Sequence, residues 1–242
     1  MDVSAENVVK CSTLLGAAFS IGMGAIGAGI GLGIGGGEAA RASARQPSGH
    51  NTIFKTMLLG QAMTETAAIF ALLVSFMLLF ALSSSAELSS AAARLGAGFA
   101  IGFGALGSGI GAGLANAMAC RGLGRRPEIS RDVNMMMLLG QSFAQSTVVF
   151  ALIIALLLLF RPAASSDMPT ICRFLGAGLC MGLGAVGPGF GSGLAGAYGV
   201  FGVSCNARQK QTIMRTMLIG QSVSQSTAIY ALVIAILLIF GV

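Results

Sequence analysis

One phrase recurs three times in this chain at a constant step of 80 residues. A fixed period indicates a repeat architecture in which each repeat is one supersecondary unit. No insertion or deletion separates the copies, so the sequence predicts three tandem units of one design. The copies are GQAMTETAAIF (60–70), GQSFAQSTVVF (140–150) and GQSVSQSTAIY (220–230). The units that follow from them are 1–84, 85–164 and 165–242.

Each unit contains two apolar segments of helix length, the first rich in glycine and the second in Leu, Ile, Met, Val and Phe. A helix needs about 20 residues to cross the hydrocarbon core of a bilayer, and all six segments are long enough. Only helices and closed barrels satisfy the backbone in lipid, and short alternating strands do not occur here. We therefore predict an all-α integral membrane protein of six transmembrane helices in three hairpins. The expected helices are about 11–45, 52–82, 88–124, 132–160, 168–205 and 212–241.

Charge is sparse and unevenly placed. Only 9% of the residues are charged, against about 25% in soluble domains. Ten of the 14 basic residues fall in or within a few residues of the three segments that join the two helices of a hairpin. Such loops face the cytoplasm, so both termini are expected on the opposite side, and a nucleic-acid partner is not expected. The start of the sequence does not resemble a signal peptide, and we expect a bacterial or archaeal plasma membrane.

The glycine-rich helices each contain the pattern G-x-G-x-x-G. A dinucleotide fingerprint needs a preceding strand and an acid about 20 residues later, so a nucleotide site is not expected inside a long apolar helix. On a helix these glycines form two adjacent rows without side chains, which allow close approach of helices on both sides, as in a tight ring. Packing within one hairpin is the alternative. The packing glycines are Gly27, Gly29, Gly31, Gly33, Gly107, Gly109, Gly111, Gly113, Gly187, Gly189, Gly191 and Gly193.

A single acid, Glu65, lies near the middle of the second span. An ionisable residue at that depth is a candidate functional site, and no basic residue lies at matching depth in any span. Apolar surroundings favour the neutral acid and a cationic partner favours the carboxylate, so Glu65 is suited to exchange one proton or bind one small cation. A protonated glutamate that only forms hydrogen bonds is the alternative. Gln145 and Gln225 replace it in the other copies and cannot lose a proton.

Two further sets of polar groups have structural interpretations. Glu38 precedes Arg41 by three residues near the cytoplasmic end of its helix, which favours an i,i+3 ion pair over a second transport carboxylate. Five cysteines show no metal-ligand spacing, and we interpret them as free thiols.

The combined motifs resemble a known family. A GxGxGxG first helix, the loop Arg45-Gln46-Pro47 and a GQAxxE(S/T) second helix are similar to the rotor-ring c subunit, or proteolipid, of F-type ATP synthases. The resemblance covers nearly the whole chain three times, whereas ordinary members are single hairpins. Fused hairpins with lost carboxylates also occur in the proteolipids of vacuolar-type and archaeal ATPases, which is one alternative. A non-rotary, channel-like proteolipid with Glu65 in a pore is another.

The resemblance implies a homo-oligomeric ring in the lipid bilayer that turns against stator subunit a and attaches to the central stalk subunits. The chain would then be a non-catalytic ion-translocating subunit without a cofactor. The residues that match the stalk-contact loop are Arg45, Gln46, Pro47, Arg125 and Pro127.

By the same resemblance Glu65 is the ion-binding acid. Sodium-type members add a glutamine that aligns with Leu32, so H+ is favoured and Na+ at Glu65 is the alternative. One acid in three hairpins predicts a low ion-to-ATP ratio, which favours ATP-driven pumping. Candidate oxygen ligands near Glu65 come from Met63, Thr66, Ser146, Ser226 and Tyr230, the last two from a neighbouring chain.

Overall fold

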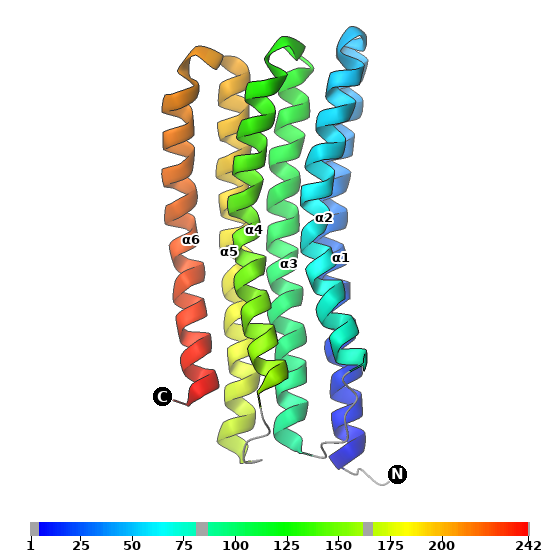
Figure 1. Cartoon of the computed structure of the whole chain (residues 1–242), viewed down its shortest axis with the longest axis vertical. Helices are drawn as coiled ribbons and strands as arrows, with labels where there is room; N and C mark the ends of the chain where they lie inside the picture. Colours follow the sequence, from blue (N-terminus) through cyan, green and yellow to red (C-terminus); the bar gives the residue numbers. More distant parts are fainter. Residues whose placement is uncertain (1–4, 81–86, 162–166, 242) are drawn as a thin grey trace.

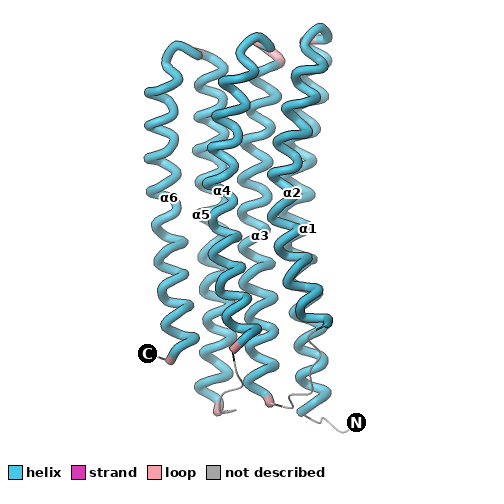
Figure 2. Tube along the Cα trace, viewed as in Figure 1, coloured by secondary structure: helices cyan, strands magenta, loops and turns pink. Residues whose placement is uncertain are grey.

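The computed structural model describes residues 5–80, 87–161 and 167–241, and every element in these ranges is helical (Figures 1 and 2). Six long helices run side by side as three hairpins, each apolar enough to cross a membrane. The predicted fold class is confirmed, while the unit borders at residues 84 and 164 lie outside the described residues. The helices are α1 Ala5–Arg45, α2 His50–Phe80, α3 Leu88–Leu123, α4 Ser130–Phe160, α5 Met168–Cys205 and α6 Lys210–Phe240.

The turn inside each hairpin is a short 3-10 helix. The three turns are η1 Pro47–Gly49, η2 Pro127–Ile129 and η3 Ala207–Gln209. The residue before each turn is extended, with φ and ψ of −132° and 76° at Gln46, −143° and 84° at Arg126, and −141° and 85° at Asn206. A proline at the first position disfavours helical backbone in the residue before it, and this explains the first two turns. The third turn has the same shape without a proline.

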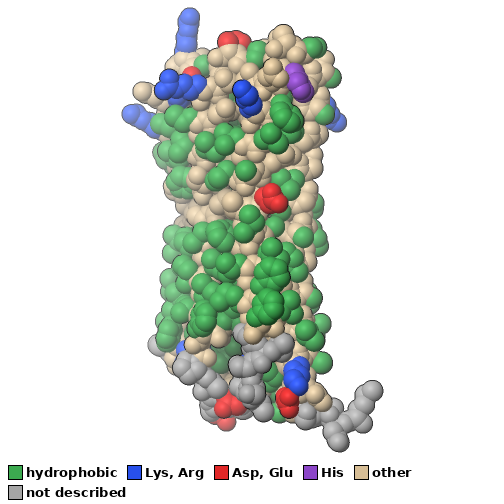
Figure 3. Space-filling view, turned by 45° about the vertical axis from the view of Figure 1, so that its right-hand side comes forward, with side chains coloured by type: hydrophobic (Ala, Val, Ile, Leu, Met, Phe, Trp, Pro, Cys, Tyr) green, Lys and Arg blue, Asp and Glu red, His purple; other side chains and the backbone are tan. Residues whose placement is uncertain are grey.

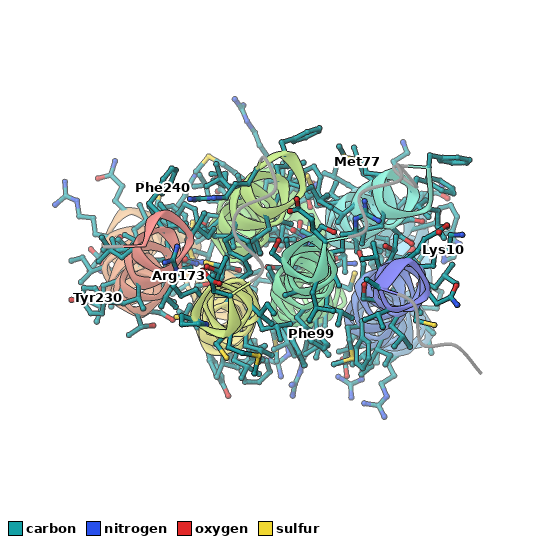
Figure 4. All side chains as sticks on the ribbon, turned by 90° about the horizontal axis from the view of Figure 1, so that it is seen from below. Lys10, Met77, Phe99, Arg173, Tyr230 and Phe240 are labelled. Atoms are coloured by element: carbon teal, nitrogen blue, oxygen red, sulfur yellow. The ribbon has the colours of Figure 1, made fainter. Side chains whose placement is uncertain are left out.

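The helices form two layers (Figure 4), with α1, α3 and α5 in one and α2, α4 and α6 in the other. The first layer is held at backbone contact by glycine. A Cβ built on Gly31 would lie 2.3 Å from the carbonyl oxygen of Gly109, and one on Gly111 would lie 2.2 Å from that of Gly189. Both distances are far below van der Waals contact, so no larger residue fits there. Glycines such as these let α1, α3 and α5 pack at backbone contact.

The glycine layer has two open edges. α3 contacts both α1 and α5, whereas α1 and α5 each have one neighbour in this layer (Figure 4). A Cβ on Gly29, Gly33 or Gly187 would meet nothing within 4 Å. One glycine row of α1 is therefore packed and its other row is bare.

The surface suits a lipid environment. Apolar side chains cover its middle zone, and basic side chains gather at its ends (Figure 3). Large apolar residues such as Leu58, Ile69 and Phe76 on α2, and Ile219 and Val233 on α6, are exposed. A soluble monomer rarely exposes a continuous apolar surface of this extent, so the chain is a multi-pass membrane protein.

Candidate functional site

Glu65 lies midway along α2 with its side chain exposed on the open edge of the molecule. In Figure 3 a single acidic side chain stands at mid-height in the apolar zone. Among the residues that the structure describes, no basic side chain forms an ion pair with Glu65; the ion pairs of these residues lie toward the helix ends. A cationic partner for this carboxyl is therefore not supplied by the described part of the chain.

The two glutamines that replace Glu65 are packed between hairpins. The side-chain amide of Gln145 donates to the carbonyl oxygen of Met63 over 2.8 Å. That of Gln225 donates to the carbonyl oxygen of Phe143 over 2.7 Å. Both side chains are only 7% exposed. Each glutamine thus reaches back to the second helix of the preceding hairpin at one common register, and Glu65 has no preceding hairpin within the chain.

A second row of glutamines lies one helical turn earlier and repeats this arrangement. Gln141 donates to the carbonyl oxygens of Gly60 over 2.9 Å and Ala112 over 3.0 Å. Gln221 makes the equivalent bonds to Gly140 and Ser192 over 3.0 and 2.9 Å. Sequence reasoning assigned no role to these residues, although their 80-residue repetition was a visible signal. They bind neighbouring hairpins together, while Gln61 reaches only Leu32 of its own hairpin, at 3.4 Å.

A groove of about 430 Å³ runs beside Gln225 between α4 and α6. Ser146 lines it and donates to the carbonyl oxygen of Phe143 over 2.7 Å, in its own helix. Its lining residues are Ser142, Phe143, Ser146, Phe150, Ser222, Gln225 and Ile229. The structure therefore places Ser146 with Gln225 and not with Glu65.

Met63 and Thr66, both on α2, contact Gln145 of the next hairpin or lie close to that contact. The carbonyl oxygen of Met63 accepts the amide of Gln145 and the hydroxyl of Thr66, the latter over 2.7 Å. Both residues therefore lie beside Gln145. Among the predicted ligands, the structure groups Met63 and Thr66 with one glutamine and Ser146 with the other.

Ser226 and Tyr230 lie on the far edge of the chain. Tyr230 is 66% exposed on α6, and Ser226, which is half-buried there, donates to the carbonyl oxygen of Val223 over 2.7 Å. α6 and α2 stand at opposite ends of their layer, with Tyr230 on the outer side of α6 (Figure 4). Within one chain these residues do not meet Glu65.

The residue that faces the acid from the glycine-rich helix differs among the units. Gln225 donates to the hydroxyl of Ser192 over 3.0 Å. In the first and second units the position of Ser192 holds Leu32 and Ala112. The side chain of Leu32 therefore offers no oxygen on the side of α1.

The loop residues gather at one end of the molecule. Arg45, Pro47 and Arg125 are exposed, and Gln46 and Pro127 are half-buried. The guanidinium of Arg125 lies 5.3 Å from the ring centre of Phe201, within cation–π range. Below this end, Arg41 pairs with Glu38 over 2.9 Å, which confirms the predicted ion pair.

Comparison with known proteins gives a consistent result for all three hairpins. The family of ATP synthase C subunits matches residues 15–78, 95–158 and 175–238. The ATP synthase c subunit of Thermotoga maritima is 41% identical over 70 residues, which cover 29% of this chain and 82% of the relative. That of Dehalococcoides mccartyi is 48% identical over 70 residues, covering 29% and 92%. An ATP synthase c subunit of Cereibacter sphaeroides, numbered 2 in that organism, is 42% identical over 73 residues, covering 30% and 88%.

Proposed function

Because this chain belongs to the family of ATP synthase C subunits, as a fusion of three hairpins, we propose that it is a rotor-ring subunit that binds one ion per three hairpins at Glu65. One observation carries the proposal. Gln145 and Gln225 form the same bond to a preceding hairpin, whereas Glu65, at the equivalent position, faces an open edge. A neighbouring chain in the same register completes its surroundings.

The internal interfaces supply the geometry of the chain joint, where α5 and α6 of one chain meet α1 and α2 of the next. A Cβ on Gly27 would lie 2.4 Å from Cα of Leu106, and one on Gly107 would lie 2.7 Å from Cα of Val186. One step further, Gly187 meets Ile26 of the next chain. The bare glycine rows of the two edges thus fit each other, and repetition of one geometry leads to a ring with stator subunit a at its side.

The same register completes the site of Glu65. Gln145 reaches Met63 and Gln225 reaches Phe143, so Glu65 reaches the carbonyl oxygen of Val223 of the neighbouring chain. A protonated Glu65 can donate to this oxygen as the glutamines do. Ser226 and Tyr230 of that chain contribute hydroxyls to the groove. The acid remains neutral while it faces lipid and loses its proton opposite the stator arginine that the family resemblance implies.

The transported ion is H+ in this proposal, because Leu32 supplies no side-chain oxygen for Na+. The test is carbodiimide labelling of Glu65 at fixed pH with increasing sodium. We expect labelling that falls as pH rises and does not respond to sodium. Strong protection by sodium would establish the Na+ alternative.

One acid in three hairpins sets the ratio of ions to ATP. For a given number of hairpins, a turn carries one third of the ions that a ring with an acid in every hairpin would carry. Each charge gains about 2.3 kcal/mol per 100 mV, so each turn delivers less energy for synthesis, and each ATP can drive its few ions against a steeper gradient. Ions moved per ATP in vesicles measure this, and a ratio typical of one acid per hairpin would contradict it.

Glu65→Gln tests the assignment of the acid itself. Gln145 and Gln225 show that glutamine fits this position between hairpins with a hydrogen bond. We therefore expect the variant to assemble normally and to transport no ions. A variant that retains transport would refute the assignment of Glu65 as the ion-binding acid. A variant that fails to assemble would show that the hairpins need the carboxylate of Glu65 in order to pack.

We propose that the protein lies in a plasma membrane with its basic loops in the cytoplasm. The loops would contact the central stalk through Arg45, Gln46, Pro47, Arg125 and Pro127. Cys205 lies at the loop end and Cys11 at the opposite end, both exposed. After treatment with a reductant, a membrane-impermeant thiol reagent applied to intact cells should label Cys11 and leave Cys205 unlabelled. The opposite result would invert the topology.

A further inference from the structure

We propose that Cys172 of one chain and Cys11 of the next form a thiol pair that closes into a disulfide at each chain joint. The inference rests on the proposed side-by-side assembly and adds a modification site to it. Both thiols are exposed in the single chain, and they lie on α1 and α5, the two edge helices of the glycine layer. Their pairing follows from the packing register of the glycine layer.

The two internal interfaces show this register near the end that carries the termini. A Cβ on Gly16 would lie 2.7 Å from the carbonyl oxygen of Arg94 and 3.5 Å from Cα of Leu95. One unit later, a Cβ on Gly96 would lie 2.6 Å from the carbonyl oxygen of Phe174. At the chain joint the same relation places Gly176 against Leu14 and Leu15 of the next chain. Apart from a 3.8 Å contact to α6, the position of a Cβ on Gly176 is open in the single chain.

One helical turn toward the N-terminus, the same faces carry the cysteines. Residues four positions earlier lie on the same side of a helix, so Ser12 faces Ala91 at the first interface. Ala92 then faces Ile171 at the second interface, and Cys172 faces Cys11 at the chain joint. Burial agrees with this assignment, because Ser12, Ala91 and Ala92 are each 4% exposed while both cysteines are exposed.

The remaining cysteines have no such partner. Cys120 is buried within the chain, and Cys180 donates to the carbonyl oxygen of Ala231 on α6. Cys205 lies at the opposite end, where the equivalent loop positions hold arginine. The only cysteines that this register brings together are therefore Cys11 on α1 and Cys172 on α5, at the end that carries the termini.

The spacing at the joint suits a disulfide, which requires Cα atoms about 4.4–6.8 Å apart. Glycine-packed helices approach to backbone contact, since a Cβ on Gly98 would lie 2.3 Å from the carbonyl oxygen of Gly16. The joint has Ala18 at the position of Gly98. Its methyl group opens the joint by about 1 Å to restore van der Waals contact, which makes room for two sulfur atoms in place of the alanine and serine of the first interface.

The pair lies where the chain lacks a covalent connection. α2 ends at Phe80 and α3 begins at Leu88 at this same end, as do α4 at Phe160 and α5 at Met168. In a ring, two of every three contacts between neighbouring hairpins are thus bridged by the chain itself. The third contact lies between two chains and has no covalent link. A disulfide between Cys11 and Cys172 would supply the missing connection.

The reaction needs a disulfide-bearing oxidant on the non-cytoplasmic side, where disulfides persist. A Cys11 thiolate attacks the oxidant's disulfide, forms a mixed disulfide and releases one thiol of the oxidant. A Cys172 thiolate of the neighbouring chain then attacks Cys11 and releases the second thiol. Two thiols are oxidised to one disulfide, and the oxidant is reduced to a dithiol that carries both protons.

The test is non-reducing gel electrophoresis of membranes that contain the full-length chain, before and after treatment with a disulfide-bearing oxidant such as oxidised glutathione. We expect a ladder of covalent multimers that collapses to single chains on reduction. Cys11→Ser and Cys172→Ser should each abolish the ladder. Cys180→Ser and Cys205→Ser, as matched controls, should leave it unchanged.

Coexpression of the Cys11→Ser and Cys172→Ser chains sharpens the result. Each chain then keeps one of the two cysteines and can form only one disulfide, so the ladder should stop at the dimer. A ladder that persists in either single variant, or that depends on Cys205, would overturn the pairing. If native mass measurement shows a ring without any ladder, the thiol pair is refuted and the ring stands; if it shows only single chains, the proposed assembly itself fails.

Discussion

Restoring a second carboxylate by Gln145→Glu should double the number of ions carried per turn. The side chain of Gln145 is 7% exposed and donates over 2.8 Å to the carbonyl oxygen of Met63. A protonated glutamic acid in the same place keeps a donor for this bond, and the hydroxyl of Thr66 lies on the same stretch of α2. The variant therefore gains an acid that can lose its proton in surroundings that already fit its neutral form.

The magnitude follows from counting acids per chain. One acid becomes two in a ring of unchanged size, so twice as many ions accompany each ATP. At 200 mV each charge costs about 4.6 kcal/mol. Because the free energy of one ATP is then divided among twice as many ions, the largest gradient that ATP hydrolysis can maintain should fall to half.

The assay measures this limiting gradient in vesicles that contain the complete ATPase, at a fixed ATP-to-ADP ratio. Carbodiimide labelling of residue 145 confirms that the new acid takes up a proton. As a matched control, Glu65→Gln combined with Gln145→Glu restores one acid per chain and should return the limit to that of the unaltered protein. An unchanged limit in the single variant, with residue 145 fully labelled, would refute the reasoning that the count of acids sets the ratio.

Three further predictions concern stability, each measured as the melting temperature of the detergent-extracted assembly. Gly111→Ala should cost about 1–3 kcal/mol by overpacking, because its Cβ would lie 2.2 Å from a backbone oxygen of α5. Gly37→Ala should cost nothing, because the equivalent positions of the other units already hold the buried Ala117 and Ala197. Gln141→Leu should cost about 1–3 kcal/mol through two lost hydrogen bonds, one to Gly60 of the preceding hairpin and one to Ala112 of its own, with Ser142→Ala as the neutral exposed control. Asp132→Asn should cost about 0.2–1 kcal/mol, less at high salt, since both side chains of its 2.6 Å ion pair are partly exposed. Equal effects in a variant and its control would contradict the first two, and an effect independent of salt the third.

The sequence predicted the helices well because hydropathy and repeat period report the same units. The largest difference is the start of α1, which begins at Ala5 and not near residue 11. The extra turns are polar and carry an ion pair between Glu6 and Lys10, which supports a helix in water. Hydropathy marks only the part of a helix that lipid surrounds. Pro188 lies inside α5 without ending it, since buried helices in a membrane tolerate proline where neighbouring groups compensate.

The candidate acid could be identified from the sequence, whereas the hydrogen-bond acceptors of the glutamines that replace it could not. A lone carboxyl in an apolar span is visible in the sequence, as is its replacement by glutamine. The acceptors are backbone carbonyl oxygens of Met63 and Phe143, and a carbonyl leaves no mark in a sequence. The grouping of Thr66 and Ser146 with the glutamines depends on which side of a hairpin its neighbour occupies. The 80-residue repeat would look the same whichever side of a hairpin the next hairpin occupies. Only the packed structure shows which side it is.

Two departures from the repeat bear on the placement of the acid. Glu65 replaces glutamine on one edge of the chain, and Tyr230 replaces phenylalanine on the other. The groove beside Gln225 contains Phe150, and the same register carries Tyr230 to Glu65 of the next chain. Two unrelated changes could as well fall on different interfaces, yet both fall on the chain joint. In the proposed ring, the joint therefore brings Tyr230 of one chain to Glu65 of the next, and the helices that carry them, α6 and α2, are not neighbours within a single chain.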